Sequence, residues 1–347
     1  MHAPRRSRPR PRPPRPADQL RTQEAATSSP AGHPEIAVHG RTLAYALLAG
    51  VSVVWGLHWV VAKVGLETMP PFQYGVLRVV TGLAVLVGIL AARRDLRIPS
   101  RADLPIVLSV GLGPIASGIA LMNLALLVVP AGRSSILVYT MPIWVAVLGV
   151  LFFHMRPTRP EVAGVALGIG GIVLLLNPAV IDWGVEGEAA GAAMLLVNAV
   201  VWALAAIHIR RHTWHATPLE LQPWQLLIAL VPLAILALVF DGGKSIEWTP
   251  QTVLVLLYSG PVATAFAYWA SQSVTRTLGP LASTTGFLAV PVVGLLAGSI
   301  LLGEALTAVD IAGFGLVLIG VAATSLGARR SAGTSEAVAE AESPVGA

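Results

Sequence analysis

Two ionisable side chains, His58 and Arg78, lie inside long apolar runs of the sequence. An ionisable group at membrane depth is costly, so it marks a functional site by default. A histidine there could bind a carboxylate or relay a proton near neutral pH, and the planar guanidinium of Arg78 suits a carboxylate or phosphate. The structural alternatives are an imidazole bonded to a neighbouring helix and an arginine paired with a helix C-terminus or a carboxylate.

Uncharged polar and aromatic groups in the same runs extend the set of candidates for binding a small substrate. Together with His58 and Arg78, the set contains Trp55, Trp59, Asn123, Tyr139, Asn198, Trp202, Tyr268 and Gln272. Such groups also hold membrane helices together by hydrogen bonds. We therefore expect only part of the set to line a cavity.

Three further charged residues have the spacing of structural contacts. Lys63 and Glu67 are four residues apart and can pair on one helix face, which predicts a salt bridge at the membrane interface. Glu304 lies in a short polar turn between two apolar runs. We expect it to cap a helix or accept hydrogen bonds, not to couple transport to an ion.

The sequence contains none of the common catalytic motifs. It has no Gly-x-Ser-x-Gly, no His-Glu-x-x-His, no P-loop lysine and no cysteine. His208, His212 and His215 share a helix face and could bind a metal, but their position beside two arginines favours a solvated helix end. We expect no catalytic residue, no metal and no cofactor.

Composition identifies the class of protein to which these residues belong. With 55% hydrophobic and 12% charged residues and a mean hydropathy of +0.73, the chain is an integral membrane protein. Its apolar runs, each near the length that crosses a bilayer as a helix, span residues 43–65, 72–92, 104–127, 131–153, 160–178, 188–209, 219–240, 251–274, 280–302 and 308–326.

The distribution of charge predicts the orientation. Residues 1–42, rich in Arg and Pro, and residues 327–347 are predicted to be disordered tails. Most basic residues fall in the tails and in alternate loops, which places both termini in the cytoplasm of a cell that carries the protein in its plasma membrane. The net charge of +5 forms no basic face, so we expect no nucleic-acid partner, only the bilayer and a small-molecule substrate. Whether the chain forms a homodimer is left open.

The chain repeats itself. A shift of 149 residues aligns Pro142 with Pro291 and places Gly164 on Gly313 and Gly171 on Gly320. A shift of 147 residues aligns Trp55 with Trp202 and Gly113-Pro114 with Gly260-Pro261. Residues 43–178 and 188–326 thus form two halves of five spans each. Because five is odd, the second half enters the membrane from the opposite side, an arrangement typical of secondary transporters.

The aligned prolines predict flexible points. Pro142 and Pro291 lie within the fourth span of each half and leave the carbonyls of Val138 and Phe287 without their helical partner. We expect kinks there that face a cavity and act in gating.

Several motifs resemble a known family. Residues 55–59 (WGLHW), 70–72 (PPF) and Arg78 resemble the opening of an EamA-type repeat of the drug/metabolite transporter superfamily, and residues 302–304 (LGE) resemble its end. The resemblance implies an all-α membrane protein of ten helices in two inverted five-helix repeats. It also implies a secondary transporter of a small metabolite, such as an amino acid or a related compound, acting in export.

The sequence departs from this family in three places. His58 replaces a small or amide residue, Glu304 has no acidic counterpart in the first half, and the first span lacks the glutamate of small multidrug exporters. This last departure argues against antiport of cationic drugs. The alternative function is a multispan membrane enzyme or lipid-handling protein without transport.

Overall fold

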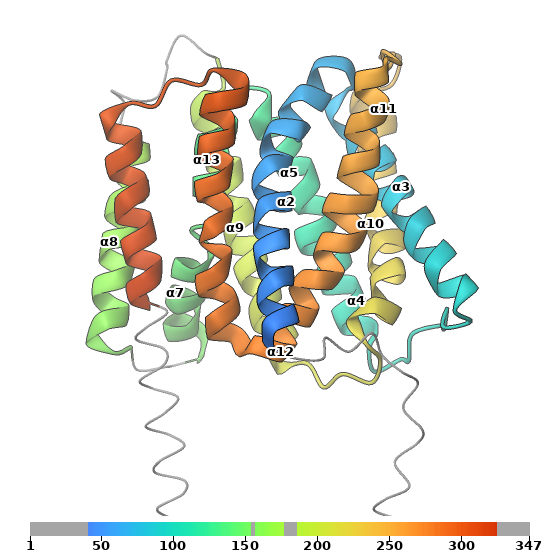
Figure 1. The fold of residues 1–347 in the computed structure, drawn as a ribbon, viewed down its shortest axis with the longest axis horizontal. Coiled ribbons are helices and arrows are strands. Elements are labelled where there is room, and N and C mark those ends of the chain that lie inside the picture. Colours follow the sequence, from blue (N-terminus) through green and yellow to red (C-terminus); the bar gives the residue numbers. More distant parts are fainter. Residues whose placement is uncertain (1–40, 154–156, 177–185, 325–347) are drawn as a thin grey trace, which may run out of the picture. The chain divides into compact units, whose positions relative to one another are not determined.

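The computed structural model describes residues 41–153, 157–176 and 186–324. These residues form helices joined by short connections (Figure 1). The tails expected at residues 1–42 and 327–347 fall almost entirely outside the described ranges.

The first half crosses the membrane five times. Its second and third crossings are joined by an irregular connection, and its third and fourth crossings are each built from more than one helical segment. The elements are α2 (Arg41–Thr68), α3 (Pro71–Ala92), α4 (Leu104–Val110) with the π-helix η1 (Gly111–Ser117) and α5 (Gly118–Leu126), α6 (Ala131–Val138) with α7 (Met141–Phe153), and α8 (Arg159–Leu175).

The second half repeats this order. Its elements are α9 (Glu188–Arg211), α10 (Pro218–Phe240), α11 (Pro250–Leu257) with the π-helix η2 (Tyr258–Phe266) and α12 (Ala267–Phe287), α13 (Ala289–Leu302), and a last helix, Ala308–Thr324. Seven of the ten crossings are long and apolar enough to be identified as membrane spans by length and composition. The remaining three are α8, α13 and the last helix.

The two halves have opposite orientations. The start of α2 and the end of the last helix lie at the same end of the helices (Figure 1). We call this end the inner end, because the charge pattern predicts it to be cytoplasmic, and the opposite one the outer end. The fold is therefore two inverted five-helix repeats, as the odd number of spans in each half predicts.

Contacts between the halves follow the same symmetry. The first helix of each half packs against the third and fourth crossings of the other: α2 against α12 and α13, and α9 against α5 and α7. Likewise α3 packs against η2, and its counterpart α10 against η1. The interior of the protein is thus an interface between the repeats.

Proline causes an irregularity at the same place in both halves. Pro114 lies inside η1 and Pro261 inside η2. Proline has no N–H to donate, so the ladder of i to i−4 bonds is interrupted and the helix widens locally. The alignment of the two Gly-Pro pairs predicts equivalent positions; it does not predict the π-helical geometry.

The helix is interrupted just before Pro142 and Pro291, the two positions where the sequence predicts kinks. In the first half α6 ends at Val138, and α7 begins at Met141. In the second half Leu288 separates α12 from α13. Each proline lies in the first turn of the new helix, where its missing N–H costs nothing.

The spans predicted at 251–274 and 280–302 imply a linker at residues 275–279, and this prediction is wrong because α12 continues through these residues. The polar residues there mark the expected membrane boundary, and polarity alone does not interrupt backbone hydrogen bonding.

Four glycines allow the fifth helices of the two halves to touch. A Cβ added at Gly164 would lie 2.6 Å from the carbonyl oxygen of Gly320, and one at Gly171 would lie 2.8 Å from that of Gly313. These are the glycines that the repeat aligns, and each pairs with the counterpart of the other. Small residues let membrane helices approach closely, so the repeated glycines form the contact of α8 with the last helix.

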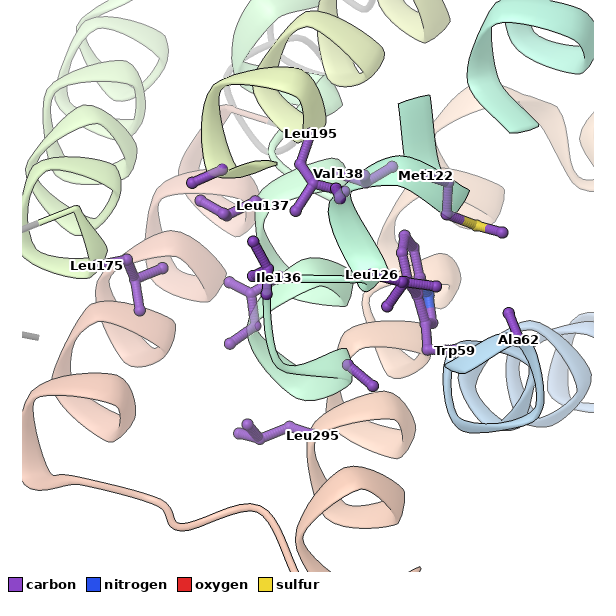
Figure 2. Close-up of a cluster of buried hydrophobic side chains, with 14 of the residues drawn as sticks. Trp59, Ala62, Met122, Leu126, Ile136, Leu137, Val138, Leu175, Leu195 and Leu295 are labelled. Atoms are coloured by element: carbon purple, nitrogen blue, oxygen red, sulfur yellow. The ribbon is translucent and has the colours of Figure 1, made fainter. Parts of the chain in front are cut away.

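An apolar cluster surrounds the short helix α6 (Figure 2). Trp59 of α2 packs there with Leu126 of α5 and Leu137 of α6, while Leu195 of α9 and Leu295 of α13 complete the cluster. Trp59 is therefore a packing residue and lies apart from the other tryptophans of the candidate set.

Candidate substrate site

Three aromatic rings from three helices meet where the two halves join. Trp55 of α2 lies edge to face against Trp202 of α9, with ring centroids 6.2 Å apart, and against Tyr268 of α12 at 5.5 Å. Tyr268 stacks on Trp202 at 5.8 Å. We call these residues the aromatic trio. Since Trp55 and Trp202 are equivalent positions of the repeat, the trio lies on the boundary between the halves.

The irregular segments of the second half border the trio. Trp55 Nε1 donates a hydrogen bond to the carbonyl oxygen of Ala263 in η2 (3.0 Å). The ring of Trp55 also lies 5.8 Å from that of Phe287, the last residue before the break at Leu288. Trp55 thus contacts both irregular segments of the second half.

The π-helix of the first half also ends next to the trio. Tyr139 lies in the break between α6 and α7 and packs against the apolar cluster around α6. Trp202 Nε1 would lie 3.4 Å from a Cβ on Gly118, the residue that follows η1. Irregular backbone at membrane depth is tolerated only where it faces protein or a water-filled cavity. The π-helix η2, the break at Leu288 and the end of η1 therefore lie around the trio.

His58 lies one helical turn from Trp55 on α2 and is only 3% exposed. Its ring stacks on Tyr258 of η2, with centroids 6.4 Å apart, and Tyr258 in turn donates a hydrogen bond to the carbonyl oxygen of Val54. His58 Nε2 has no hydrogen-bond partner in the described part of the chain. Nε2 is therefore not hydrogen-bonded to a neighbouring helix among the described residues, which was the structural alternative for His58.

Arg78 of α3 is 4% exposed. Its Nε donates to Thr264 Oγ1 (2.8 Å), and the Thr264 hydroxyl donates to the carbonyl oxygen of Ser259 (2.7 Å). Among the described residues no carboxylate forms an ion pair with Arg78. The guanidinium thus supports η2 through one nitrogen and keeps its charge uncompensated by any described acid.

Gln222 of α10, which the sequence did not single out, also supports η2. Its Nε2 lies 3.2 Å from the carbonyl oxygen of Thr264 and 3.3 Å from that of Ala265, while its Oε1 is buried without a partner among the described residues. Side chains of α2 and α10 therefore donate hydrogen bonds to carbonyls of η2, and Arg78 of α3 supports the same segment through the Thr264 hydroxyl. The only sequence signal for Gln222 was an amide inside an apolar run.

The counterpart of Arg78 in the second half is Gln225, at a shift of 147 residues. Gln225 is fully buried, and neither its Nε2 nor its Oε1 has a partner in the ranges described. The two halves therefore place a cation and a neutral amide at the same position, so the interface is symmetric in backbone and asymmetric in charge.

Three amides of the candidate set differ in place. Asn198 Nδ2 donates to the carbonyl oxygen of Gly118 (3.2 Å), beside Trp202, and Gln272 Nε2 lies 3.4 Å from that of Tyr268. Asn123 instead joins α5 to the start of α3 by a bond to Pro71 (2.8 Å). In all three the amide oxygen is buried without a described partner. Asn198 and Gln272 flank the trio, whereas Asn123 lies toward the outer end.

Ionic contacts close the outer end. Glu304 accepts hydrogen bonds from the backbone N–H groups of Ala131 (2.6 Å) and Gly132 (2.9 Å), so it caps α6. This confirms the capping role expected for Glu304. Lys63 Nζ donates to the carbonyl oxygen of Val129 (3.0 Å) and lies 3.7 Å from Glu304 Oε1. The predicted pair of Lys63 with Glu67 is therefore wrong, because partners in the turn after α13 and in the connection before α6 lie within reach.

A second ionic group at that end joins three crossings. Arg133 of α6 donates to Glu188, at the start of α9, and to Asp310 of the last helix (3.3 Å for Nε to Oδ1). Asp310 also caps its own helix through the backbone N–H and hydroxyl of Thr307. These long-range pairs had no signal in the sequence.

At the inner end the carboxylate of Asp103, just before α4, joins two loops. It accepts hydrogen bonds from His212 Nε2 (3.0 Å), the backbone N–H of His215 (3.1 Å) and Ser100 Oγ (2.8 Å). Burial raises the pKa of Asp103, but these hydrogen bonds outweigh it and hold the pKa below its usual value. His208 bonds Ser109 instead (2.7 Å). No group of three acids and histidines able to hold a metal occurs in the described ranges.

A pocket of about 330 Å³ opens between α7 and α9 near the inner end. Its walls are mostly aliphatic and aromatic, and it lies outside the aromatic trio; it is lined by Leu148, Phe152, Leu204, Ile207, His208 and Arg211.

Two inverted repeats whose irregular segments converge on a polar and aromatic centre define a class: a multi-pass membrane transporter. The family comparison agrees with this class. The chain belongs to the EamA-like transporter family, whose model matches residues 42–177 and 189–326.

Curated relatives cover nearly the whole of this fold. A "Probable amino-acid metabolite efflux pump" of Salmonella typhimurium is 32% identical over 78% of this chain and 91% of its own length. The Escherichia coli protein of the same name is 30% identical over 80% and 93%. An "Uncharacterized transporter YoaV" of Bacillus subtilis is 27% identical over 79% and 94%.

One solved crystal structure has a similar fold. It superposes with a TM-score of 0.59 at 22% identity and covers 84% of this chain and 99% of its own. At that identity the likeness concerns the fold alone.

Proposed function

We propose that the protein is a secondary transporter that exports a small metabolite, an amino acid or a related compound, from the cytoplasm by alternating access. In this proposal it lies in the plasma membrane with both termini cytoplasmic. The observation that carries the proposal is the contact of Trp55 with Trp202, equivalent residues of the two repeats, at a point bordered by irregular segments of both halves. A site on the boundary of two inverted halves can be exposed to one side and then to the other when the halves rock.

The choice of an amino acid or a related compound has two supports. The names of two relatives at 30% and 32% identity refer to amino-acid metabolites. The site itself combines a buried cation, buried amide oxygens and aromatic surface, which is the chemistry that a small amphiphilic metabolite requires. The direction of transport, export, is inferred only from the names of these relatives.

Reconstitution of the purified full chain into proteoliposomes tests the proposal. We expect a labelled amino acid to cross the membrane chemically unchanged and the flux to fall at least about tenfold in Trp202→Ala, because the trio loses its shared ring. Leu254→Ala, at an exposed apolar position of α11, is the control and should keep its flux. Absence of flux for every member of a broad metabolite panel would overturn the proposal. Chemical conversion of a panel member without flux would instead support the membrane enzyme.

Alternating access has its own test because the chain contains no cysteine. A single cysteine replacing Ala205, one helical turn from Trp202, should react with a membrane-impermeant thiol reagent from both sides, and a transported substrate should slow the reaction. Reaction from one side only, with and without substrate, would contradict alternating access.

A further inference from the structure

The strongest unexplained feature of the site is a pair of buried polar side chains that lack described partners suited to them. His58 Nε2 has no hydrogen-bond partner, and Arg78 has no carboxylate, in the part of the chain that the structure describes. Buried polar groups are normally hydrogen-bonded and buried charges paired. A group that binds during the transport cycle would account for both.

The two side chains act on the same region. Both residues contact η2, His58 through Tyr258 and Arg78 through Thr264. Both can donate hydrogen bonds, and a guanidinium binds carboxylates well. An anionic group would therefore satisfy both side chains at once.

Asn198 offers the opposite chemistry nearby. Its Oδ1, a hydrogen-bond acceptor, is buried without a described partner. Helices α2 and α9 run in opposite directions, so His58, three residues after Trp55, and Asn198, four residues before Trp202, are both displaced from the tryptophan pair toward the outer end. At 1.5 Å per residue these displacements are about 4.5 and 6 Å. The donor His58 on α2 and the acceptor Asn198 on α9 therefore lie at a similar depth of the interface, next to the aromatic trio.

We propose that His58 and Arg78 bind the carboxylate of the transported metabolite while Asn198 accepts a hydrogen bond from its ammonium group, so the site selects zwitterionic amino acids with apolar side chains. This inference rests on the proposed function and assigns its binding groups. The apolar side chain packs on the trio, whose rings offer apolar surface. His58 is a position at which this sequence departs from the EamA pattern, and its counterpart in the second half is Ala205. The carboxylate site is therefore a property of the first half alone.

Binding to the purified full chain tests the assignment. The probes are L-leucine and L-phenylalanine, their amides, which lack the carboxylate, and 4-methylpentanoate and 3-phenylpropanoate, which lack the ammonium group. We expect the amino acids to raise the thermal midpoint of unfolding, and both kinds of analogue to bind roughly tenfold or more weakly, because each leaves a buried polar group unpaired.

Variants separate binding from a structural role. His58→Ala and Arg78→Gln install the residues that occupy the equivalent positions of the second half, so the backbone accommodates them. Each should reduce the preference for the amino acid over its amide toward one, with the affinity for the amide changed by no more than about twofold. Glu67→Gln, at an exposed outer position, should keep the wild-type preference. If Arg78→Gln fails to fold, Arg78→Lys replaces it; because lysine keeps the charge but not the planar guanidinium, the preference for the amino acid should then fall only part of the way toward one.

The result that overturns the assignment is also defined. Three results would each overturn it. The amino acids fail to raise the midpoint, the analogues bind as tightly as the amino acids, or the variants weaken the binding of amino acid and amide equally. If another metabolite is then transported in proteoliposomes, the proposed function stands without this inference. If no metabolite is transported, the proposed function fails as well.

Discussion

Trp55 and Trp202 lie edge to face with ring centroids 6.2 Å apart, although 147 residues separate them in the sequence. Their hydrogen bonding differs. The indole N–H of Trp55 donates to the carbonyl oxygen of Ala263 in η2, whereas that of Trp202 has no partner in the described part of the chain. The two residues therefore occupy symmetric positions, but only Trp55 supports η2 by a hydrogen bond.

This asymmetry predicts different effects of one substitution. Trp55→Phe should lower the free energy of unfolding by about 1–3 kcal/mol more than Trp202→Phe, because it leaves the carbonyl of Ala263 buried without a donor. The midpoints of thermal unfolding in one detergent provide the comparison. Equal midpoints would show that the bond to Ala263 does not stabilise η2.

Glycines of α8 provide a matched pair for testing the contact with the last helix. Gly164→Ala places a methyl group 2.6 Å from the Gly320 carbonyl oxygen, whereas Gly170→Ala meets nothing within 4 Å. The first should destabilise the protein by about 1–3 kcal/mol by overpacking. The second should be neutral or stabilise by up to about 1 kcal/mol, since alanine favours the helix. A similar midpoint for both variants would contradict the close packing.

The cap on α6 predicts a role for Glu304 that is independent of ion coupling. Glu304→Ala should cost about 1–3 kcal/mol, because two backbone N–H groups lose a charged acceptor at a helix N-terminus. Glu67→Ala is the control, since Glu67 is exposed at the same end. Thermal midpoints measure the cost. Flux by those Glu304→Ala molecules that fold should keep its dependence on ion gradients; loss of that dependence alone would indicate coupling.

The ionic group around Arg133 should resist opening at the outer end. Arg133→Gln leaves the carboxylates of Glu188 and Asp310 without this cation, and all three side chains are largely buried. We expect a loss of up to about 3–5 kcal/mol in stability. A cysteine replacing Ala205 should also react faster from the outer side in this background. Unchanged reactivity would show that the group does not hold this end closed.

Asp103 predicts a loss of stability in acid. Its folded-state pKa is lowered, so its contribution is present above the pKa of the unfolded chain and is lost as the pH falls through the folded value, below about 4. Between pH 7 and pH 3 the thermal midpoint of the wild type should fall further than that of Asp103→Asn. Parallel curves would show that the bonds from His212 and His215 do not stabilise the carboxylate.

Composition and internal alignment were enough to predict the class, the ten crossings and the inversion of the halves. These features follow from local hydrophobicity, from the odd number of spans and from prolines and glycines that shape the backbone wherever they occur. The equivalence of Trp55 with Trp202 and of Gly164 with Gly313 was visible in the same way. The contacts of these residues were not.

Only the tertiary structure decided which polar groups face one another. Lys63 lies near Glu304 and not Glu67, and Trp59 belongs to the cluster around α6 and not to the trio. Gln222 and Gln225 are buried in the interior, although no sequence motif marks them. The expected kinks at Pro142 and Pro291 became breaks between helices. The physical reason is that a membrane helix presents its polar groups to partners on other helices, and sequence spacing carries information only about neighbours on its own helix.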